Sequence, residues 1–90
     1  MTDKATLAER IEGLGPMSDN SLDVEIEVAL FEPNPRALSI RPNNAGTKVI
    51  HTSATGEEST HWARDWTVSK NRKSTIAALR AHAAMENDDA

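Results

Sequence analysis

The three histidines are the side chains in this sequence best suited to bind a transition metal, because the chain contains no cysteine. No His-Glu-x-x-His run is present, and no pair of histidines is spaced to share one helix face. Asp65 follows His61 by four residues, a spacing that brings two side chains together on a helix but not on the extended segment expected there. The histidines are His51, His61 and His82. We therefore predict that the protein holds no metal and no cofactor.

Candidate nucleophiles and acids do not fall into catalytic patterns. Adjacent Glu57 and Glu58 lie in a polar stretch, where nothing would raise a pKa for general acid catalysis. Gly13 and Gly15 follow a predicted helix instead of a strand, so they do not form a dinucleotide-binding loop. No serine stands in a Gly-x-Ser-x-Gly turn; the candidates are Ser39, Ser53, Ser59, Ser69 and Ser74. We predict that the protein is not an enzyme.

Aromatic and basic side chains gather between residues 62 and 73. Near the start of the last predicted helix, free backbone N–H groups and the positive end of the helix dipole favour an anion. Three basic residues around that helix start would strengthen the attraction for a phosphate, a nucleic-acid backbone or an acidic protein surface. The predicted binding residues are Trp62, Arg64, Trp66, Lys70, Arg72 and Lys73.

A purely structural explanation of the same residues stays open. Lys70, Arg72 and Lys73 would then pair with the acids of residues 19–32 or remain solvated. Both tryptophans would belong to the core, because the chain has only three aromatic residues with which to build one. The sequence does not decide between the two explanations.

Residues 18–32 carry five acids and no base, which suggests a second hypothesis, in which acidic side chains form the binding surface. If residues 21–31 form a strand, Asp23, Glu25 and Glu27 share one face about 6.8 Å apart. That spacing is near the phosphate spacing of a nucleic-acid strand, so the segment would mimic nucleic acid. The net charge of −4 makes such mimicry weak.

The first element that positions these residues is a helix at residues 3–13. Leu7, Ile11 and Leu14 recur at helical spacing and form one apolar stripe. Asp3 is a suitable N-cap, and Pro16 cannot continue the helix.

Residues 21–31 fit two structures. Leu22, Val24 and Ile26 alternate with acids as in a half-buried strand, and periodicity alone favours that structure. Leu22, Ile26 and Ala29 also share one face of a helix. Asn20 or Ser21 would cap the start of that helix.

The remaining chain predicts a sheet and a final helix. Strands are expected at residues 37–41 and 47–52, joined by a loop of about five residues. Residues 54–60 are expected to form a mobile loop, and an extended segment follows with Trp62, Arg64, Trp66 and Val68 on one face. An alanine-rich helix is expected at 73–86, capped by Asn71 or Ser69, with a frayed tail at 87–90.

Length and composition bound the fold. Ninety residues suffice for one domain, which we assign to residues 1–90. No apolar run is long enough to cross a membrane, and the first residues lack the apolar stretch of a secretory signal, so we expect a cytoplasmic protein.

Both ends of the sequence resemble the phage ABA sandwich domain family. The resemblance rests on Leu7-Ala8-Glu9-Arg10-Ile11-Glu12, on Gly15-Pro16, on the Leu22-Asp23-x-x-Ile26-x-x-Ala29-Leu30 pattern, and on the Ala-rich run from Ser74 to Ala83. It implies that residues 21–31 are helical, which we adopt. The expected fold is then α+β in the order α-α-β-β-β-α, with a short antiparallel sheet covered by N-terminal and C-terminal helices.

The resemblance also implies a small phage or prophage protein that works in the host cytoplasm. We expect a non-enzymatic accessory protein that binds a host or phage protein complex, in the manner of an anti-CRISPR inhibitor of host defence. Nucleic-acid contact through the basic residues is a further expectation. The alternative is a structural component of the virion or of its assembly.

Overall fold

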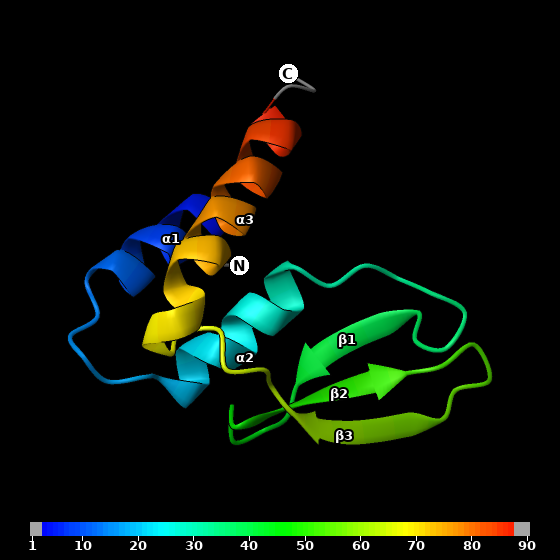
Figure 1. Ribbon diagram of the computed structural model, residues 1–90. Helices are drawn as coiled ribbons and strands as arrows, with labels where there is room; N and C mark the ends of the chain where they lie inside the picture. The colour runs from blue at the N-terminus through cyan, green and yellow to red at the C-terminus, as the bar shows by residue number, and fades with distance from the viewer. Residues whose placement is uncertain (1–2, 88–90) are drawn as a thin grey trace.

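A computed structural model describes residues 3–87, with side chains through residue 85. Three helices and three strands follow one another in the order α-α-β-β-β-α, which confirms the expected α+β class. Helices α1 and α3 pack together, and α2 lies between this pair and the sheet (Figure 1). No helix in the described range is long and apolar enough to cross a membrane. The elements are α1 (Lys4–Glu12), α2 (Asn20–Ala29), β1 (Ser39–Pro42), β2 (Lys48–Thr52), β3 (Glu58–Trp62) and α3 (Ser69–Asn87).

Helix α1 forms where the apolar stripe predicts it. The Asp3 carboxylate caps its start by accepting hydrogen bonds from the N–H groups of Ala5 and Thr6. Leu7 and Ile11, one helical turn apart, are both buried. The helix ends at Glu12, and Gly13 is its C-cap, whose N–H still donates to the carbonyl of Glu9.

Residues 20–29 are helical, so the structure implied by the family resemblance is confirmed and the strand favoured by periodicity is wrong. Asp19, and neither Asn20 nor Ser21, is the N-cap, accepting from the N–H of Leu22. Because α2 packs against α1 on one side and against β1 and β2 on the other, it buries apolar residues on more than one stripe. Val24 is buried along with Leu22 and Ile26, and this wider apolar surface produced the strand-like alternation.

The helical structure of α2 also removes the premise of the acidic-strand hypothesis. On a helix, Asp23, Glu25 and Glu27 no longer form an extended row at strand spacing. Asp23 is buried, and Glu25 forms an ion pair with Arg10 at 2.7 Å. The mimicry of a nucleic-acid strand by this segment is therefore withdrawn.

The sheet is a three-stranded antiparallel meander in the order β1-β2-β3. Ile40 lies opposite His51, and Ile50 lies opposite Thr60. The first hairpin agrees with the prediction: its turn closes when the N–H of Asn43 donates to the carbonyl of Lys48 at 3.0 Å. Helix α2 covers the sheet near β1 and β2, whereas α3 packs along α1.

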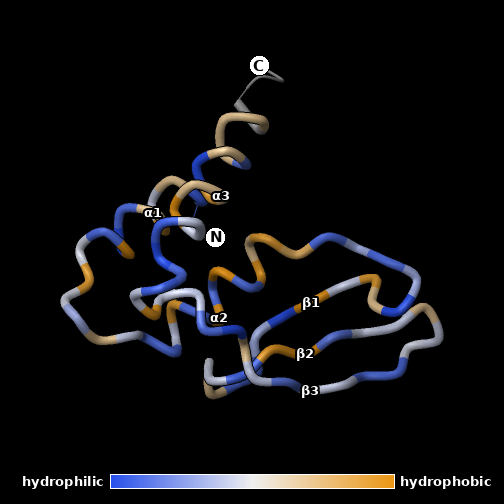
Figure 2. The backbone as a smooth tube through the Cα atoms, in the orientation of Figure 1, coloured by the Kyte–Doolittle hydropathy of each residue, from blue (hydrophilic) through white to orange (hydrophobic). Residues whose placement is uncertain are grey.

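The third strand differs from the expectation. Residues 58–60 belong to β3 and not to a loop, and the extended face predicted from Trp62 through Val68 is wrong because the chain leaves the sheet after Trp62. Every residue of β3 is exposed, so its sequence carries no apolar alternation that would reveal a strand. Figure 2 shows the same contrast: β2 has a hydrophobic stretch and β3 does not.

Helix α3 begins at Ser69, four residues before the expected start. The carbonyl of Val68 accepts from the N–H groups of Asn71 and Arg72, so the first turn is already helical. The basic residues at 70, 72 and 73 therefore lie in the first turns of α3. Asn87, the first residue of the tail expected at 87–90, is the last residue of α3, and residues 88–90 lie outside the described range.

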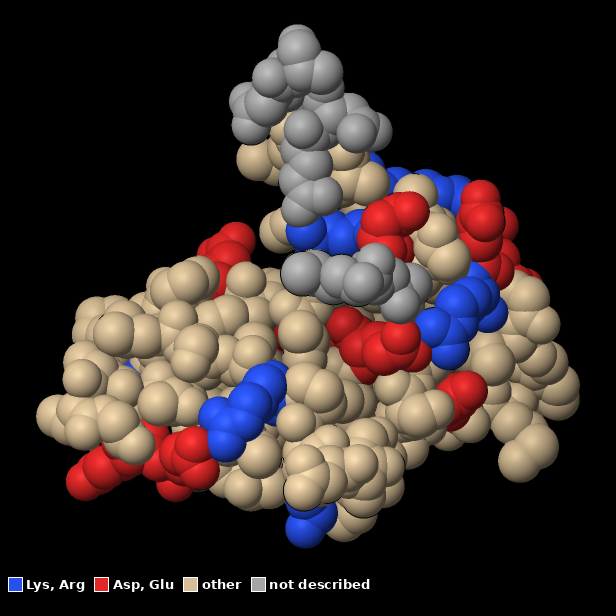
Figure 3. Space-filling model, turned by 180° about the vertical axis from the view of Figure 1, so that it is seen from behind, with Lys and Arg blue, Asp and Glu red and all other residues tan. Residues whose placement is uncertain are grey.

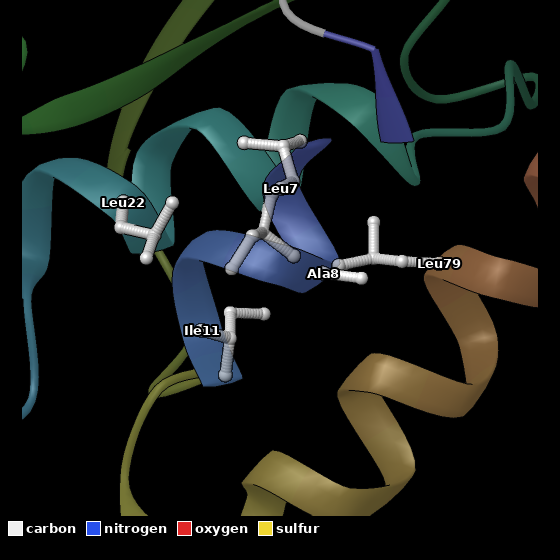
Figure 4. Close-up of a cluster of buried hydrophobic side chains, with 6 residues drawn as sticks. Leu7, Ala8, Ile11, Leu22 and Leu79 are labelled. Atoms are coloured by element: carbon white, nitrogen blue, oxygen red, sulfur yellow. The ribbon is translucent and has the colours of Figure 1, made fainter. Parts of the chain in front are cut away.

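The core lies between the three helices (Figure 4). Leu79 of α3 reaches toward Leu7 and Ala8 of α1, while Leu22 lies on the α2 side of the same cluster. Partly buried Trp66 and Ile76 pack against this cluster. The fully buried members are Leu7, Ala8, Ile11, Leu22, Ile26 and Leu79.

Candidate binding surface

The Arg72 guanidinium makes three hydrogen bonds within the fold. Its Nε donates to the carbonyl of Thr67 at 2.5 Å, and its two terminal nitrogens donate to the carbonyls of Gly15 and Met17, each at 2.7 Å. One guanidinium thus ties the first turn of α3 to the loop between α1 and α2. This planar fork of donors is the geometry that arginine provides and lysine does not.

The Trp66 side chain and the Arg64 backbone also form hydrogen bonds with α2. Trp66 is half-buried against the helical core, and its indole Nε1 donates to Glu27 Oε1 at 3.3 Å. The same carboxylate oxygen accepts from the backbone N–H of Arg64 at 3.1 Å. The Arg64 guanidinium lies 5.8 Å from the Trp66 ring, within cation–π range. Glu27 therefore anchors residues 63–68, the connection between β3 and α3.

Thr67 completes this anchoring and is fully buried. Its N–H donates to Asp23 Oδ1 at 2.9 Å, and its hydroxyl oxygen accepts from the N–H of Asp19 at 2.8 Å. The acids of α2 thus bind the backbone and indole of residues 64–67. No ion pair joins them to Lys70, Arg72 or Lys73 among the described residues.

Two neighbouring acids of this network have pKa values shifted in opposite directions. Burial raises the pKa of Asp23 above its ordinary value of 3.8, although the hydrogen bonds from Thr67 act to lower it. For Asp19, hydrogen bonds from the Ser21 hydroxyl and the Leu22 N–H lower the pKa below its ordinary value. The first group holds a proton more tightly in the folded protein, and the second holds it less tightly.

The opposite shifts predict opposite pH signatures for two asparagine variants. A raised folded pKa means that the stability contributed by Asp23 is complete below about pH 3.8 and is lost as the pH rises through the raised pKa. Asp23→Asn keeps an acceptor for Thr67 and does not titrate, so it should gain stability relative to the wild type across that rise. Urea unfolding at a series of pH values measures the difference.

Asp19→Asn is the matched control for that experiment. Asparagine caps a helix as well as aspartate does, but the stability tied to the lowered pKa of Asp19 is present above 3.8 and lost as the pH falls. This variant should therefore lose stability relative to the wild type as the pH rises. Parallel slopes for the two variants would contradict the assignment.

Trp62 is a predicted binding residue whose side chain lies exposed on the sheet. Its side chain is 67 % exposed, although tryptophan is usually buried in a small domain. It lies opposite Lys48 on β2, whose Nζ sits 4.6 Å from the centre of the indole ring. Lys70 and Lys73 are exposed as well, on α3. The structure therefore divides the predicted binding residues between the sheet, the 63–68 connection and α3.

Strand register defines the surface around Trp62. Directly paired residues share one face of a sheet, and the face with Val49 is covered, since Val49 is buried and His51 contacts Phe31 at 5.9 Å between ring centres. The opposite face is open to solvent, and we call it the open face. Its residues are Ser39, Arg41, Lys48, Ile50, Thr52, Glu58, Thr60 and Trp62.

The open face combines an aromatic anchor with mixed charge. Arg41 forms an ion pair with Glu58 at 2.6 Å and donates to the hydroxyl of Thr52 at 3.3 Å. Lys48 remains beside Trp62. On the side of the molecule shown in Figure 3, basic and acidic side chains are likewise interspersed and form no broad area of one sign. Lys48 was not among the predicted binding residues, because its proximity to Trp62 follows only from the register.

The part of the chain that the structure describes contains no cluster of metal-binding side chains. No group of three or more histidine and carboxylate side chains converges between residues 3 and 85. The rings of His51 and His61 lie 5.3 Å apart, and His61 Nε2 forms a hydrogen bond with the Ser59 hydroxyl at 3.1 Å.

Comparisons with known proteins add no relative: no family model, no curated protein and no solved structure matches the chain. The resemblance to the phage ABA sandwich domain family stays a prediction.

Proposed function

We propose that this protein acts by binding another macromolecule and not by catalysis. In this proposal it is a small phage-type accessory protein that works in the host cytoplasm and inhibits a defence protein complex of the host. The open face of the sheet makes the contact, and Trp62 is its anchor.

The exposed Trp62 is the observation that carries the proposal. Exposing an indole costs hydrophobic free energy that the half-buried Trp66 does not incur. Tryptophan and arginine are the residues most enriched among those that dominate protein interfaces, and Trp62 shares the open face with Arg41. An exposed sheet face with one aromatic anchor suits the surface of a folded partner better than a small molecule, which requires a concave pocket.

Trp62→Ala is the variant that tests the proposal. In bacterial strains that carry different defence systems, including CRISPR systems targeted to a phage, the wild-type protein should restore plaque formation in at least one strain. Trp62→Ala should lose this activity and weaken binding to the purified defence complex by about tenfold or more, as expected when an interface anchor is truncated.

Met17→Ala is the matched control, because Met17 is also a large apolar side chain, 77 % exposed, but lies outside the sheet. It should retain full activity. The proposal would be contradicted if the wild-type protein left plaque formation unchanged in every strain. It would also be contradicted if the Trp62→Ala and wild-type proteins were equally active.

Two other outcomes define the competing functions. Nucleic-acid contact through the basic residues predicts binding that weakens steeply with salt and is lost when Lys70 and Lys73 are replaced by alanine. A structural role in the virion, which the unpaired outer edge of β3 favours, predicts copurification with phage particles and no effect on defence.

A further inference from the structure

Within residues 3–87, the outer edge of β3 pairs with no other strand, because β3 is the last strand of the sheet. Among the helices and strands, β2 is the element that packs against β3. At the second hairpin the N–H of Ser53 donates to the carbonyl of Glu57 at 2.9 Å, which fixes the alternation of the antiparallel ladder. The groups of Ser59 and His61 then point toward β2, and those of Glu58, Thr60 and Trp62 point outward.

This edge lacks several features that prevent strand addition. Natural edge strands are protected by shortness, charged side chains, proline, a bulge or a cover. Along its five continuous pairs with β2, β3 has no proline, lysine or bulge, and its one charged side chain, Glu58, forms an ion pair with Arg41. The other edge shows the contrast. On β1 the same alternation turns Ile40 and Pro42 outward, and proline has no N–H to donate. Of the two edges of the sheet, β3 is therefore the one with a complete set of outward N–H donors.

The sequence of β3 is complementary to itself when two copies run antiparallel about Thr60. Thr60 then lies opposite Thr60 of the second copy, and Glu58 lies opposite Trp62. Glu58, which forms an ion pair with Arg41 of its own chain, then lies opposite an indole that carries the Lys48 ammonium at 4.6 Å, so opposite charges are close across the new pair. On the other face Ser59 meets His61. No two like charges lie directly opposite, which would destabilise the pairing.

We propose that two copies of this chain dimerise through β3, edge to edge and antiparallel, to form one six-stranded sheet. The three outward residues of each strand supply both the donors and the acceptors of the new ladder. The two open faces become one continuous surface with a Trp62 on each side of the two-fold axis. This inference concerns self-association and goes beyond the proposed function.

The experiment measures the mass of the protein in solution by sedimentation equilibrium over a wide dilution series. The wild type should approach twice the monomer mass at high concentration. Thr60→Lys should remain monomeric, because it places two ammonium groups side by side at the two-fold axis. Thr60→Pro should also remain monomeric, since it removes an outward N–H and leaves the ladder with β2 intact.

Ser39→Lys is the matched control, with the same charge change on the opposite edge strand, and it should dimerise as the wild type does. Circular dichroism checks that each variant is folded. A wild type that stays monomeric at every concentration, or a Thr60→Lys protein that associates as strongly as the wild type, overturns the proposal. The plaque assay with Trp62→Ala reports on the proposed function separately, because it does not measure mass.

Discussion

Replacing Leu79 with alanine is expected to lower the free energy of unfolding by about 2–5 kcal/mol, the range for truncating a fully buried leucine. Leu79 has no exposed surface and is the fully buried α3 residue in the cluster that joins the three helices. A domain of this size has little stability to spare, so the variant should be largely unfolded or close to it at 37 °C. Urea unfolding followed by circular dichroism measures the change.

Met85→Ala on the same helix is the control for that prediction. Met85 is 69 % exposed, so its truncation should change the free energy of unfolding by no more than about 0.5 kcal/mol. Both substitutions introduce alanine into α3, so helix propensity does not explain a difference in stability between the two variants. Equal effects of the two would show that α3 is not held against α1 through Leu79.

Arg72→Ala is expected to lower the free energy of unfolding by about 1.5–3 kcal/mol, the range for hydrogen bonds made by a charged group. Three carbonyl groups lose their donor at once. That of Thr67 belongs to a buried residue, while those of Gly15 and Met17 belong to exposed residues that water can reach. The loss should be accompanied by faster hydrogen exchange in residues 13–18, the loop that the guanidinium holds.

Lys73→Ala provides the comparison for Arg72→Ala, because it removes a neighbouring positive charge from an exposed position. It should leave both stability and the exchange of the loop nearly unchanged. Arg72→Lys should behave more like Arg72→Ala than like the wild type, since one ammonium group cannot reproduce the fork. Full stability of Arg72→Lys would mean that charge, and not geometry, matters at this position.

The parts of the fold that the sequence predicted well are those specified by local physics. Asp3 and the Leu7–Ile11 spacing define α1 without reference to the rest of the chain. The turn around Asn43 and Gly46 likewise specifies the first hairpin, and Gly46 adopts the positive φ of 68° that such turns require.

The parts that were missed depend on long-range packing. Helix α2 packs against α1 on one side and against the sheet on the other, so its apolar residues show a strand-like alternation. Periodicity does not distinguish such a helix from a half-buried strand. A third strand was predicted, but its bounds were wrong, because all five residues of β3 are exposed. Backbone pairing with β2, which leaves no pattern in the side chains, is what makes it a strand.

The candidate site was predicted only in part for the same reason. Trp62 stands exposed as a binding residue would. Arg72 and Trp66 are also of residue types that are common in binding sites, but each forms hydrogen bonds with a segment distant in sequence. Arg72 donates to the carbonyls of Gly15 and Met17, and Trp66 donates to Glu27. Nothing in the local sequence distinguishes an arginine that reaches a partner from one that reaches a distant carbonyl.

The pairing of α1 with α3 has a consequence for how the protein is made. Translation delivers Leu7 and Ile11 first, yet Leu79, which covers them, leaves the ribosome only after the sheet has been synthesised. Until then the nascent chain carries a bare apolar helix surface, the kind of surface that chaperones bind and that promotes aggregation. Closure of the core is thus a late event in synthesis, and the alanine-rich α3 suits it, since such a sequence becomes helical quickly once it emerges.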